Sequence, residues 1–500
     1  MNCATWTSFQ SVKATIYGSS RDYADYLRFN KRPDIRTPVL DISIKDDRLL
    51  TPGYLFLTPY GVDMPGPYIF DTSGNLIWSG ADSSTTEIYH GLHVCPYNGS
   101  DHLCFYQGIQ TEGYTRGRQT IFDSTYKPTA TVQSGNGMLP CDLHEMTVLD
   151  GETALLTIYQ TRPYNLEEYD INAANGWVID GVFQEVDIKT GKVLFQWRSL
   201  DHVPLSASQT PLRLDEMVGD GLTNNSAWDY FHINSVDKNH EGDYLVSSRH
   251  ASSIYKVSGK DGSIIWQLGG RQSSIQLTNY NFSYQHDARF REENETTTVL
   301  SFFNNGSNQH QNTSSTSSGM IISVDHNTNT STLIKQYNAP GDGLLSTFLG
   351  NTQILTNNNV IIGWGNNPSI SEHTEDGTAI FFATLVGIDV QNYRAFKYNW
   401  TAKPNDPPAL RAVSTPGNSA TTFWVSWNGA TDIDRWRIHA TTPASDEFVP
   451  LDAIQRQGFQ TTYTSMNYHP KAFAEAITAD GLSLANSSVV DTSSTLPASE

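Results

Sequence analysis

The sequence predicts an all-β protein, a six-bladed β-propeller followed by a small C-terminal β-sandwich domain. Three observations support this prediction. One strand–turn–strand pattern recurs along the first four hundred residues, helical periodicity is scarce, and Gly and Pro occur at short intervals. A chain of 500 residues exceeds what one ordinary hydrophobic core supports, so a repeat architecture or several domains is expected.

The repeated unit starts with an apolar residue and a polar or acidic one, passes through a turn containing Gly or Asn, and continues as an alternating apolar run. Each copy predicts a β-hairpin, because period-two alternation flanks a turn. The copies start about 47 to 69 residues apart, a spacing that suits a four-stranded blade with its loops. The six copies begin at Phe70, Phe122, Val186, Tyr255, Val324 and Ser371.

The repeat defines the expected domains. Residues 1–50 are expected to be an N-terminal extension and residues 51–400 the propeller, since stacked blades bury both faces of each sheet. A pair of β-sandwiches is the rival architecture, but it lacks an internal period. Beyond a linker rich in Pro and Asn, residues 409–487 are expected to form a small β-sandwich and residues 488–500 a disordered tail.

The composition limits the partners and the compartment. The formal net charge is −20 and no run is rich in Lys or Arg, so a nucleic-acid partner is not expected. No apolar stretch reaches the ~18 residues of a membrane span. Residues 1–36 lack the apolar core of a signal peptide, but the sequons favour a secreted glycoprotein whose signal is not part of this sequence. The nine sequons begin at Asn98, Asn224, Asn281, Asn294, Asn305, Asn312, Asn329, Asn399 and Asn486.

The cysteines give one structural prediction. Cys95 and Cys104 flank a six-residue segment with strong turn character between two runs that contain aromatic residues. A hairpin closed there brings both sulfurs within cross-strand reach, so a disulfide is predicted. The spacing offers no partner for Cys3 or Cys141.

Polar residues in four segments are candidates for a site, because the inner strands of all blades converge on a propeller's axis. The segments are residues 142–146, residues 228–236 with 247–250, residues 282–290 and residues 363–372. None has the ligand spacing of a zinc site, so neither a metal nor a cofactor is expected.

Several motifs in these segments resemble the fungal branch of the arylsulfotransferase (ASST) family. They are His-Ile-Asn-Ser-Val from His232, Gln-His-Asp-Ala-Arg from Gln285, Leu-His-Glu from Leu143, and Gly-Trp-Gly from Gly363. The resemblance runs from about Thr51 to the end of the predicted propeller. It implies a six-bladed propeller that moves a sulfuryl group from an aryl sulfate to another phenol, through a histidine nucleophile and without a nucleotide donor.

Carried over motif by motif, the resemblance implies these site residues. The catalytic candidates are His232, His286, Arg289 and His144, and the substrate-binding candidates are Arg249, Asn234, Trp364 and Tyr230. Imidazole serves as a nucleophile or as a proton donor near neutral pH, and a guanidinium offers a fork of donors to sulfuryl oxygens. In the last blade, where the family's nucleophile is expected, the sequence offers Pro368 and Ser369, and His373 is displaced towards a turn.

Purely structural interpretations remain open for the three histidines, Arg289 and Arg249. His144 suits a residue that satisfies the start of a strand. His232 is also compatible with a core histidine that is hydrogen-bonded to the backbone. The segment from His286 to Arg289 is compatible with a structural ion-pair cluster, and Arg249 with a solvated turn. Two other functions also remain. One is an acid/base enzyme on the same scaffold, a cyclase or isomerase of a phenolic or polyketide-like secondary metabolite. The other is a secreted propeller that binds its partner without catalysis.

Overall fold

The computed structural model describes residues 26–82, 84–111, 113–169, 175–415 and 419–494. The described chain is built of β-strands joined by turns, with three single-turn 3₁₀ helices, so the all-β prediction is confirmed. Among the described residues, no helix has the length and apolarity that crossing a bilayer requires.

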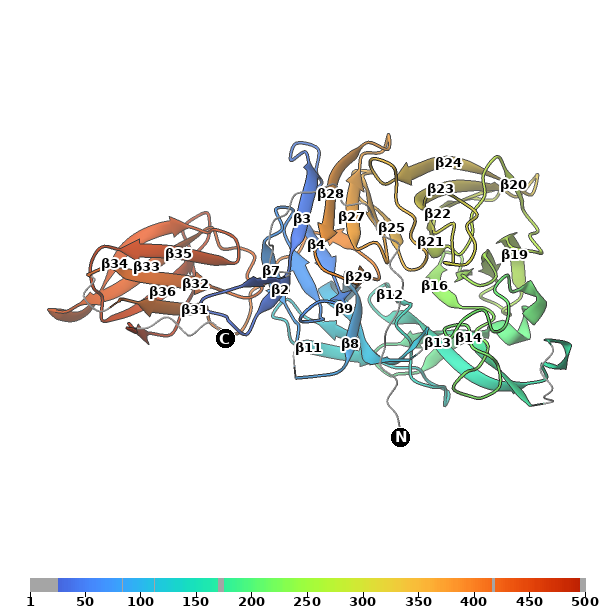
Figure 1. The fold of residues 1–500 in the computed structure, drawn as a ribbon, viewed down its shortest axis with the longest axis horizontal. Helices are drawn as coiled ribbons and strands as arrows, with labels where there is room; N and C mark the ends of the chain where they lie inside the picture. Colours follow the sequence, from blue (N-terminus) through green and yellow to red (C-terminus); the bar gives the residue numbers. More distant parts are fainter. Residues whose placement is uncertain (1–25, 83, 112, 170–174, 416–418, 495–500) are drawn as a thin grey trace.

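Within the described residues, the part up to Tyr398 contains two two-stranded sheets, β1 (Tyr26–Arg28) with β2 (Arg36–Pro38) and β5 (Pro59–Tyr60) with β29 (Gln391–Asn392). Six larger, mainly antiparallel sheets are arranged around a common centre (Figure 1). They are numbered here in chain order, each from its innermost strand outwards. Sheet 1 contains β30 (Phe396–Tyr398), β4 (Tyr54–Leu57), β6 (Tyr68–Phe70) and β7 (Leu76–Ser79). Sheet 2 contains β8 (Ile88–Tyr97), β9 (Ser100–Gln110), β10 (Thr115–Phe122) and β11 (Pro128–Val132). Sheet 3 contains β12 (Met146–Leu149), β13 (Thr153–Tyr164), β14 (Gly176–Asp187) and β15 (Val193–Arg198).

The other three sheets follow the same order of strands. Sheet 4 contains β16 (Ile233–Lys238), β17 (Tyr244–Ser248), β18 (Ser253–Val257) and β19 (Ile264–Gly269). Sheet 5 contains β21 (His286–Glu293), β22 (Thr297–Asn304), β23 (Ser318–Asp325), β24 (Thr330–Asn338) and the parallel edge strand β20 (Gln276–Thr278). Sheet 6 contains β25 (Asn351–Ile354), β26 (Val360–Gly363), β27 (Ser369–His373), β28 (Ala379–Leu385) and β3 (Leu40–Lys45).

The six hairpins predicted from the repeat are all present, and each joins the third and fourth strands of its sheet. The pairs are β6–β7, β10–β11, β14–β15, β18–β19, β23–β24 and β27–β28. The repeat is visible in the sequence because a turn and the alternation on either side of it are local features. The tryptophans that end three of the copies, Trp78, Trp197 and Trp266, are buried in the apolar clusters of the sheets.

Both ends of this region close the ring. β30 comes from the end of the region and pairs with β4 near its start, while β3 pairs with β28 on the outer edge of sheet 6. Residues 1–50 were expected to form an N-terminal extension, and the structure corrects this for residues 40–45. The strand belongs to sheet 6 because its backbone groups saturate an edge that is otherwise open.

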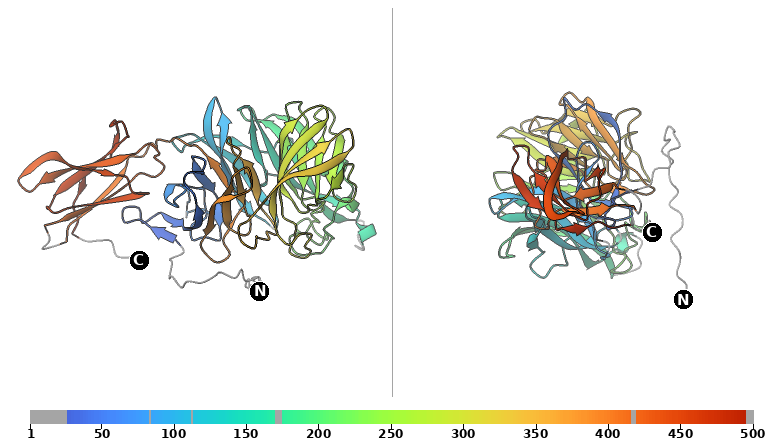
Figure 2. Two further views of the ribbon diagram at one scale, coloured as in Figure 1. Left: turned by 90° about the horizontal axis from the view of Figure 1, so that it is seen from above. Right: turned by 90° about the vertical axis from the view of Figure 1, so that its left-hand side faces the viewer.

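The C-terminal residues form two sheets packed over one apolar core. One sheet contains β31 (Ala409–Val413), β32 (Thr421–Ser426) and β35 (Gln460–Ser465). The other contains β34 (Ser445–Gln455), β33 (Arg435–Thr442), β36 (Lys471–Ile477), β37 (Ser483–Asn486) and β38 (Val490–Asp491). This unit lies to one side of the ring (Figure 2). Because β38 pairs with β36, the expected disordered tail is corrected for residues 490–491, while residues 495–500 lie outside the described residues.

The predicted disulfide joins Cys95 on β8 to Cys104 on β9, with a Cα–Cα distance of 5.9 Å. The two residues lie diagonally across the hairpin, since Cys104 faces His93 in the strand register. Cys141 is a free, buried thiol, and Cys3 lies outside the described residues.

Candidate functional site

The beginnings of the inner strands bring several histidines together near the centre of the ring. His144 precedes β12 and His232 precedes β16, and their ring centroids lie 4.9 Å apart. His286 opens β21, and its ring lies 6.4 Å from that of Tyr393, which also contacts His144 at 5.5 Å. These three histidines, together with His250, are called the histidine cluster. His144, His232, His286 and Trp364 were expected to meet at the axis; the structure brings the three histidines together, whereas Trp364 packs against Phe303 in an apolar cluster.

Carboxylates hold two of these imidazoles by Nδ1. His144 donates to Oδ1 of Asp142, and His232 donates to Oδ2 of Asp229 at 2.5 Å. Both carboxylates are buried and precede their histidines by two and three residues. His232 has a φ of 53°, a left-handed conformation that side chains rarely adopt, and its own N–H is bonded to Asp229. In both cases the bond at Nδ1 leaves Nε2 as the ring atom available to a substrate.

Asn305 holds the third imidazole. Its Oδ1 lies 2.7 Å from Nδ1 of His286. Its amide nitrogen donates to the main-chain oxygens of Ser346 and Leu349, both at 2.9 Å. Because both amide hydrogens are used, Oδ1 faces His286 as an acceptor, and His286 carries its proton on Nδ1. The sequon at Asn305 is therefore buried in the site and is not a surface site for a glycan.

Arg249 and His250 extend the cluster on the loop after β17. His250 donates from Nδ1 to the main-chain oxygen of Asp229, and its Nε2 accepts from Nη1 of Arg249 at 2.7 Å. The Nε of Arg249 is buried and finds no hydrogen-bond partner among the described residues. The structure thus places the Arg249 guanidinium beside the imidazole of His250, where it is buried and not in a solvated turn.

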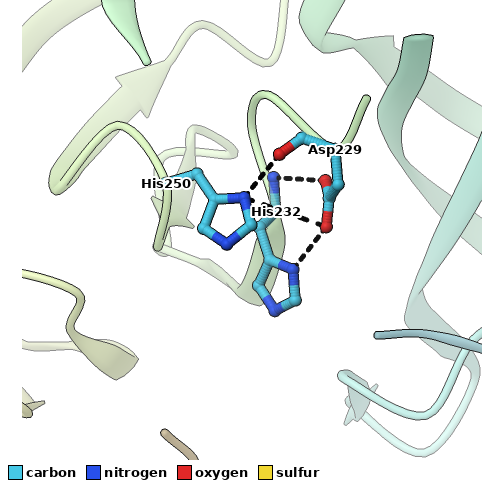
Figure 3. A group of neighbouring side chains, drawn as sticks. All are labelled: Asp229, His232 and His250. Carbon is cyan, nitrogen blue, oxygen red and sulfur yellow. Dashed lines mark hydrogen bonds and ion pairs between the residues drawn. The ribbon is translucent and has the colours of Figure 1, made fainter. Parts of the chain in front are cut away.

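Asp229, His232 and His250 also form the group whose composition suits a metal ion. One atom from each lies within 4.8 Å of the others (Figure 3). In Figure 3 both imidazoles direct Nδ1 at Asp229, and these contacts are hydrogen bonds. The guanidinium of Arg249 opposes a further cation beside His250. A hydrogen-bonded cluster therefore describes these residues better than a metal centre.

Burial sets the protonation of the cluster. Desolvation and, second, the charge of His144 hold the pKa of His232 well below its usual value. Desolvation and Arg249 do the same for His286, and desolvation and His232 for His250. Burial raises the pKa of Asp229, whereas in Asp142 the raising effect of burial is outweighed by His144 and the pKa is lowered. The low imidazole pKa values favour neutral rings with a lone pair on one nitrogen at neutral pH.

Arg289 does not join the histidines. Its guanidinium bonds to Glu145 at 2.7 Å and to Asp287 at 2.8 Å, so it belongs to a buried ion-pair network. It follows His286 by three residues along β21, across a β-bulge, so that His286 pairs with Phe303 and Arg289 with Ser301 further along β22. Arg394 completes the network at 3.3 Å from Glu145. The ion-pair cluster that was the alternative interpretation of this motif therefore includes Arg289 but not His286.

Three other predicted residues lie at or outside the edge of the cluster. Asn234 is buried, donates to the main-chain oxygen of Gln285, and has no partner for its own Oδ1 among the described residues. Tyr230 donates to the main-chain oxygen of Val203 inside the core. Trp364 is fully buried and donates to Ser371 within sheet 6. Tyr230 and Trp364 are therefore placed as core residues, because their polar groups are already paired.

The sequence reasoning did not assign a role to five residues of the site. Asp142, Asp229 and Asn305 hold the imidazoles, and Tyr159 and Tyr393 flank them, with Tyr159 stacked on His144 at 5.2 Å. An acidic residue two or three positions before each of two histidines was a usable signal. No such signal marks Asn305 or Tyr393, because these residues reach the site from the ends of other strands, β22 and β29.

A cavity of about 380 Å³ lies beyond this cluster, lined by residues of all six inner strands. It is called the axial cavity. Tyr393 and Arg394 lie between it and the histidine cluster: Arg394 donates to the main-chain oxygens of His144 and Asn234, at 2.9 and 3.0 Å. His144, His232 and His286 do not line it.

Comparison with known proteins gives a family match. The model of the arylsulfotransferase (ASST) family matches residues 94–385, from β8 to β28. No curated protein sequence matches the chain significantly.

Similar solved structures share little sequence with the chain. A protein of unknown function from Bacteroides caccae is 12% identical over 69% of this chain and 99% of its own, with a TM-score of 0.40. Hydrazine synthase from Kuenenia stuttgartiensis is 7% identical over 67% and 86%, with a TM-score of 0.31. The GH43 protein BlXynB from Bacillus licheniformis is 9% identical over 81% and 90%, also with a TM-score of 0.31.

Proposed function

The chain belongs to the arylsulfotransferase (ASST) family, and from this premise we propose that it transfers a sulfuryl group between phenolic small molecules at the histidine cluster. One observation carries the proposal: three imidazoles converge with Nδ1 held by Asp142, Asp229 and Asn305. Such anchoring leaves Nε2 for the substrate. Neither a nucleotide donor nor a cofactor has a part in the proposal.

The partners of the imidazoles suggest distinct roles. A carboxylate stabilises an imidazolium, so His144, held by Asp142, suits proton donation. His232, whose pKa is held well below its usual value, suits proton acceptance. His286 is held by a neutral amide near Arg249, so its Nε2 suits a nucleophile that stays unprotonated. Arg249, whose Nε has no hydrogen-bond partner among the described residues, is the guanidinium that suits sulfuryl oxygens.

The proposed reaction has two balanced steps. In the first, Nε2 of His286 bonds to sulfur as the S–O bond to the donor aryl group breaks, and the electron pair leaves on the phenolate oxygen. That oxygen takes a proton from the imidazolium of His144. In the second, the acceptor phenol returns a proton to this imidazole, its oxygen bonds to sulfur, and the N–S bond breaks.

The test is incubation with 4-nitrophenyl sulfate and a phenol acceptor. We expect release of 4-nitrophenol, formation of the sulfated acceptor, and loss of both in His286→Ala. With donor alone, a sulfuryl adduct is expected on the peptide that carries His286. The matched control is His240→Ala, since His240 is an exposed histidine outside the cluster. No nitrophenol release by the wild-type protein at any pH contradicts the proposal.

A second candidate function is acid/base catalysis without sulfate transfer, as in a cyclase or isomerase of a phenolic metabolite. Sheet 6 favours this function, because the family resemblance implies a nucleophile in the last blade. His373 on β27 is the one histidine in the sequence of sheet 6, and it bonds to Ser371 and Gly377, away from the cluster. Ser369 is likewise paired with Thr384. Turnover of such a substrate without any sulfate donor, lost in His286→Ala, supports this alternative over sulfuryl transfer.

A further inference from the structure

The axial cavity lies on the far side of the Tyr393–Arg394 pair from the histidine cluster. It opens where the inner strands end, since the lining residues there, Pro96 on β8 and Gln353 on β25, are exposed and half-buried. Its volume of about 380 Å³ falls within the range of roughly 300–1,000 Å³ that is typical of small-molecule sites. The cavity is therefore accessible without passing the histidine cluster.

One guanidinium of the cavity has no carboxylate partner. Of the three lining arginines, Arg289 and Arg394 are paired with Glu145 and Asp287. Arg291 instead donates to the hydroxyl of Ser301 at 2.7 Å and to the main-chain oxygen of Thr352 at 3.2 Å. Among the described residues, no carboxylate oxygen lies within 4.0 Å of its nitrogens.

The charge balance of the lining leaves Arg291 available to an anion. Asp237 also lines the cavity, and it accepts hydrogen bonds from the main-chain N–H groups of Phe290 and Lys238. Burial raises the pKa of Asp237, which favours its uncharged form. Burial lowers the pKa of Arg291, and the charges of Asp287 and Asp237 only partly oppose this effect. An anion bound beside this half-buried guanidinium therefore stabilises its charge.

Buried polar atoms of the lining also lack partners. Nδ1 of His90 and Oε1 of Gln119 have no hydrogen-bond partner among the described residues. The same holds for Nε of Arg394, whose ion-pair distance of 3.7 Å to Asp287 is too long for a hydrogen bond. Each of the three side chains is more than nine-tenths buried. All three residues line the cavity. Unsatisfied buried groups are rare in folded proteins, so a polar ligand or ordered water is expected to bond to them.

The remaining wall is aromatic. Phe290, Tyr393, Phe396 and Tyr398 line the cavity with Leu143. We propose that the axial cavity is a second binding site, separate from the histidine cluster, for a small aromatic anion whose ring packs on these residues and whose charge meets Arg291. This inference does not rest on sulfuryl transfer by the histidines.

Benzoate is the probe for this site, and calorimetric titration of the full-length protein measures its affinity. We expect benzoate to bind and Arg291→Met to weaken binding about tenfold or more, as expected for a charged hydrogen bond. Benzyl alcohol, which keeps the ring without the charge, should bind more weakly than benzoate. The matched control is Arg116→Met: Arg116 is also half-buried, donates to a main-chain oxygen and lacks a carboxylate partner among the described residues, but it does not line the cavity.

A crystal structure with benzoate and the variant His286→Ala separate this site from the histidine cluster. Benzoate beside Arg291, with unchanged affinity in His286→Ala, supports the proposal whether or not the protein transfers sulfuryl groups. Absence of benzoate binding, unchanged affinity in Arg291→Met, or benzoate bound at the histidines overturns it. A loss of affinity in Arg116→Met equal to that in Arg291→Met also overturns it, because the effect is then not specific to the cavity.

Discussion

Asn305 accepts a hydrogen bond from Nδ1 of His286 at 2.7 Å while its own amide hydrogens go to two main-chain carbonyls. We predict that Asn305→Asp raises the pKa of His286, because a carboxylate at this distance favours the imidazolium. Titration of the histidine ring signals by NMR measures this pKa. As a control, Asn338→Asp places the same charge at an exposed position. An unchanged His286 pKa in Asn305→Asp contradicts the assigned geometry.

The carboxylates of Asp142 and Asp229 offer a test of proton transfer by the imidazoles. Asn at either position keeps an acceptor for the histidine but removes the charge that stabilises an imidazolium. We predict that Asp229→Asn lowers kcat/KM for 4-nitrophenyl sulfate by about 10²-fold or more, with Asp142→Asn in the same direction. Asp261→Asn, in an exposed turn, should leave the rate unchanged. Full activity in both site variants excludes a role for the pairs in catalysis.

The buried histidines predict that stability falls in mild acid. The pKa values of His232, His250 and His286 lie well below the usual value in the folded protein, and that of His90 is about 3. Below about pH 6.5 the unfolded chain therefore binds protons that the folded chain does not, so the free energy of unfolding decreases as pH falls. Thermal melting between pH 7.5 and 5 measures this loss. His90→Gln should reduce its slope, and a flat profile contradicts the prediction.

Lys397 and Glu372 form a buried ion pair between β30 and β27, at 2.6 Å with both side chains 1% exposed. This pair links the strand that closes sheet 1 to sheet 6. We predict that Lys397→Met costs about 3–5 kcal/mol, because it leaves Glu372 charged and unpaired in the interior. Denaturant unfolding of the ring measures the cost. Lys397→Met with Glu372→Met should recover much of it, and equal destabilisation in the single and double variants refutes the pairing argument.

The sequence was a good guide to features that depend on neighbouring residues. The six hairpins and the disulfide between Cys95 and Cys104 are set by turns and alternation within a few residues. The pairing of β3 with β28 was not predicted, because most of the chain separates the two strands. The sequence of residues 40–45 does not indicate which sheet edge they cover.

In the candidate site, too, local features were predictable from the sequence and contacts between distant residues were not. The sequence by itself determined that His144, His232 and His286 stand at the starts of strands, since motif and turn positions are local. Only the tertiary structure decided that Asn305 holds His286 and that Arg289, in the same motif, faces Glu145 instead. The physical reason is that partners come from other strands. Three residues along one inner strand are enough to move a side chain from the histidine cluster to the axial cavity.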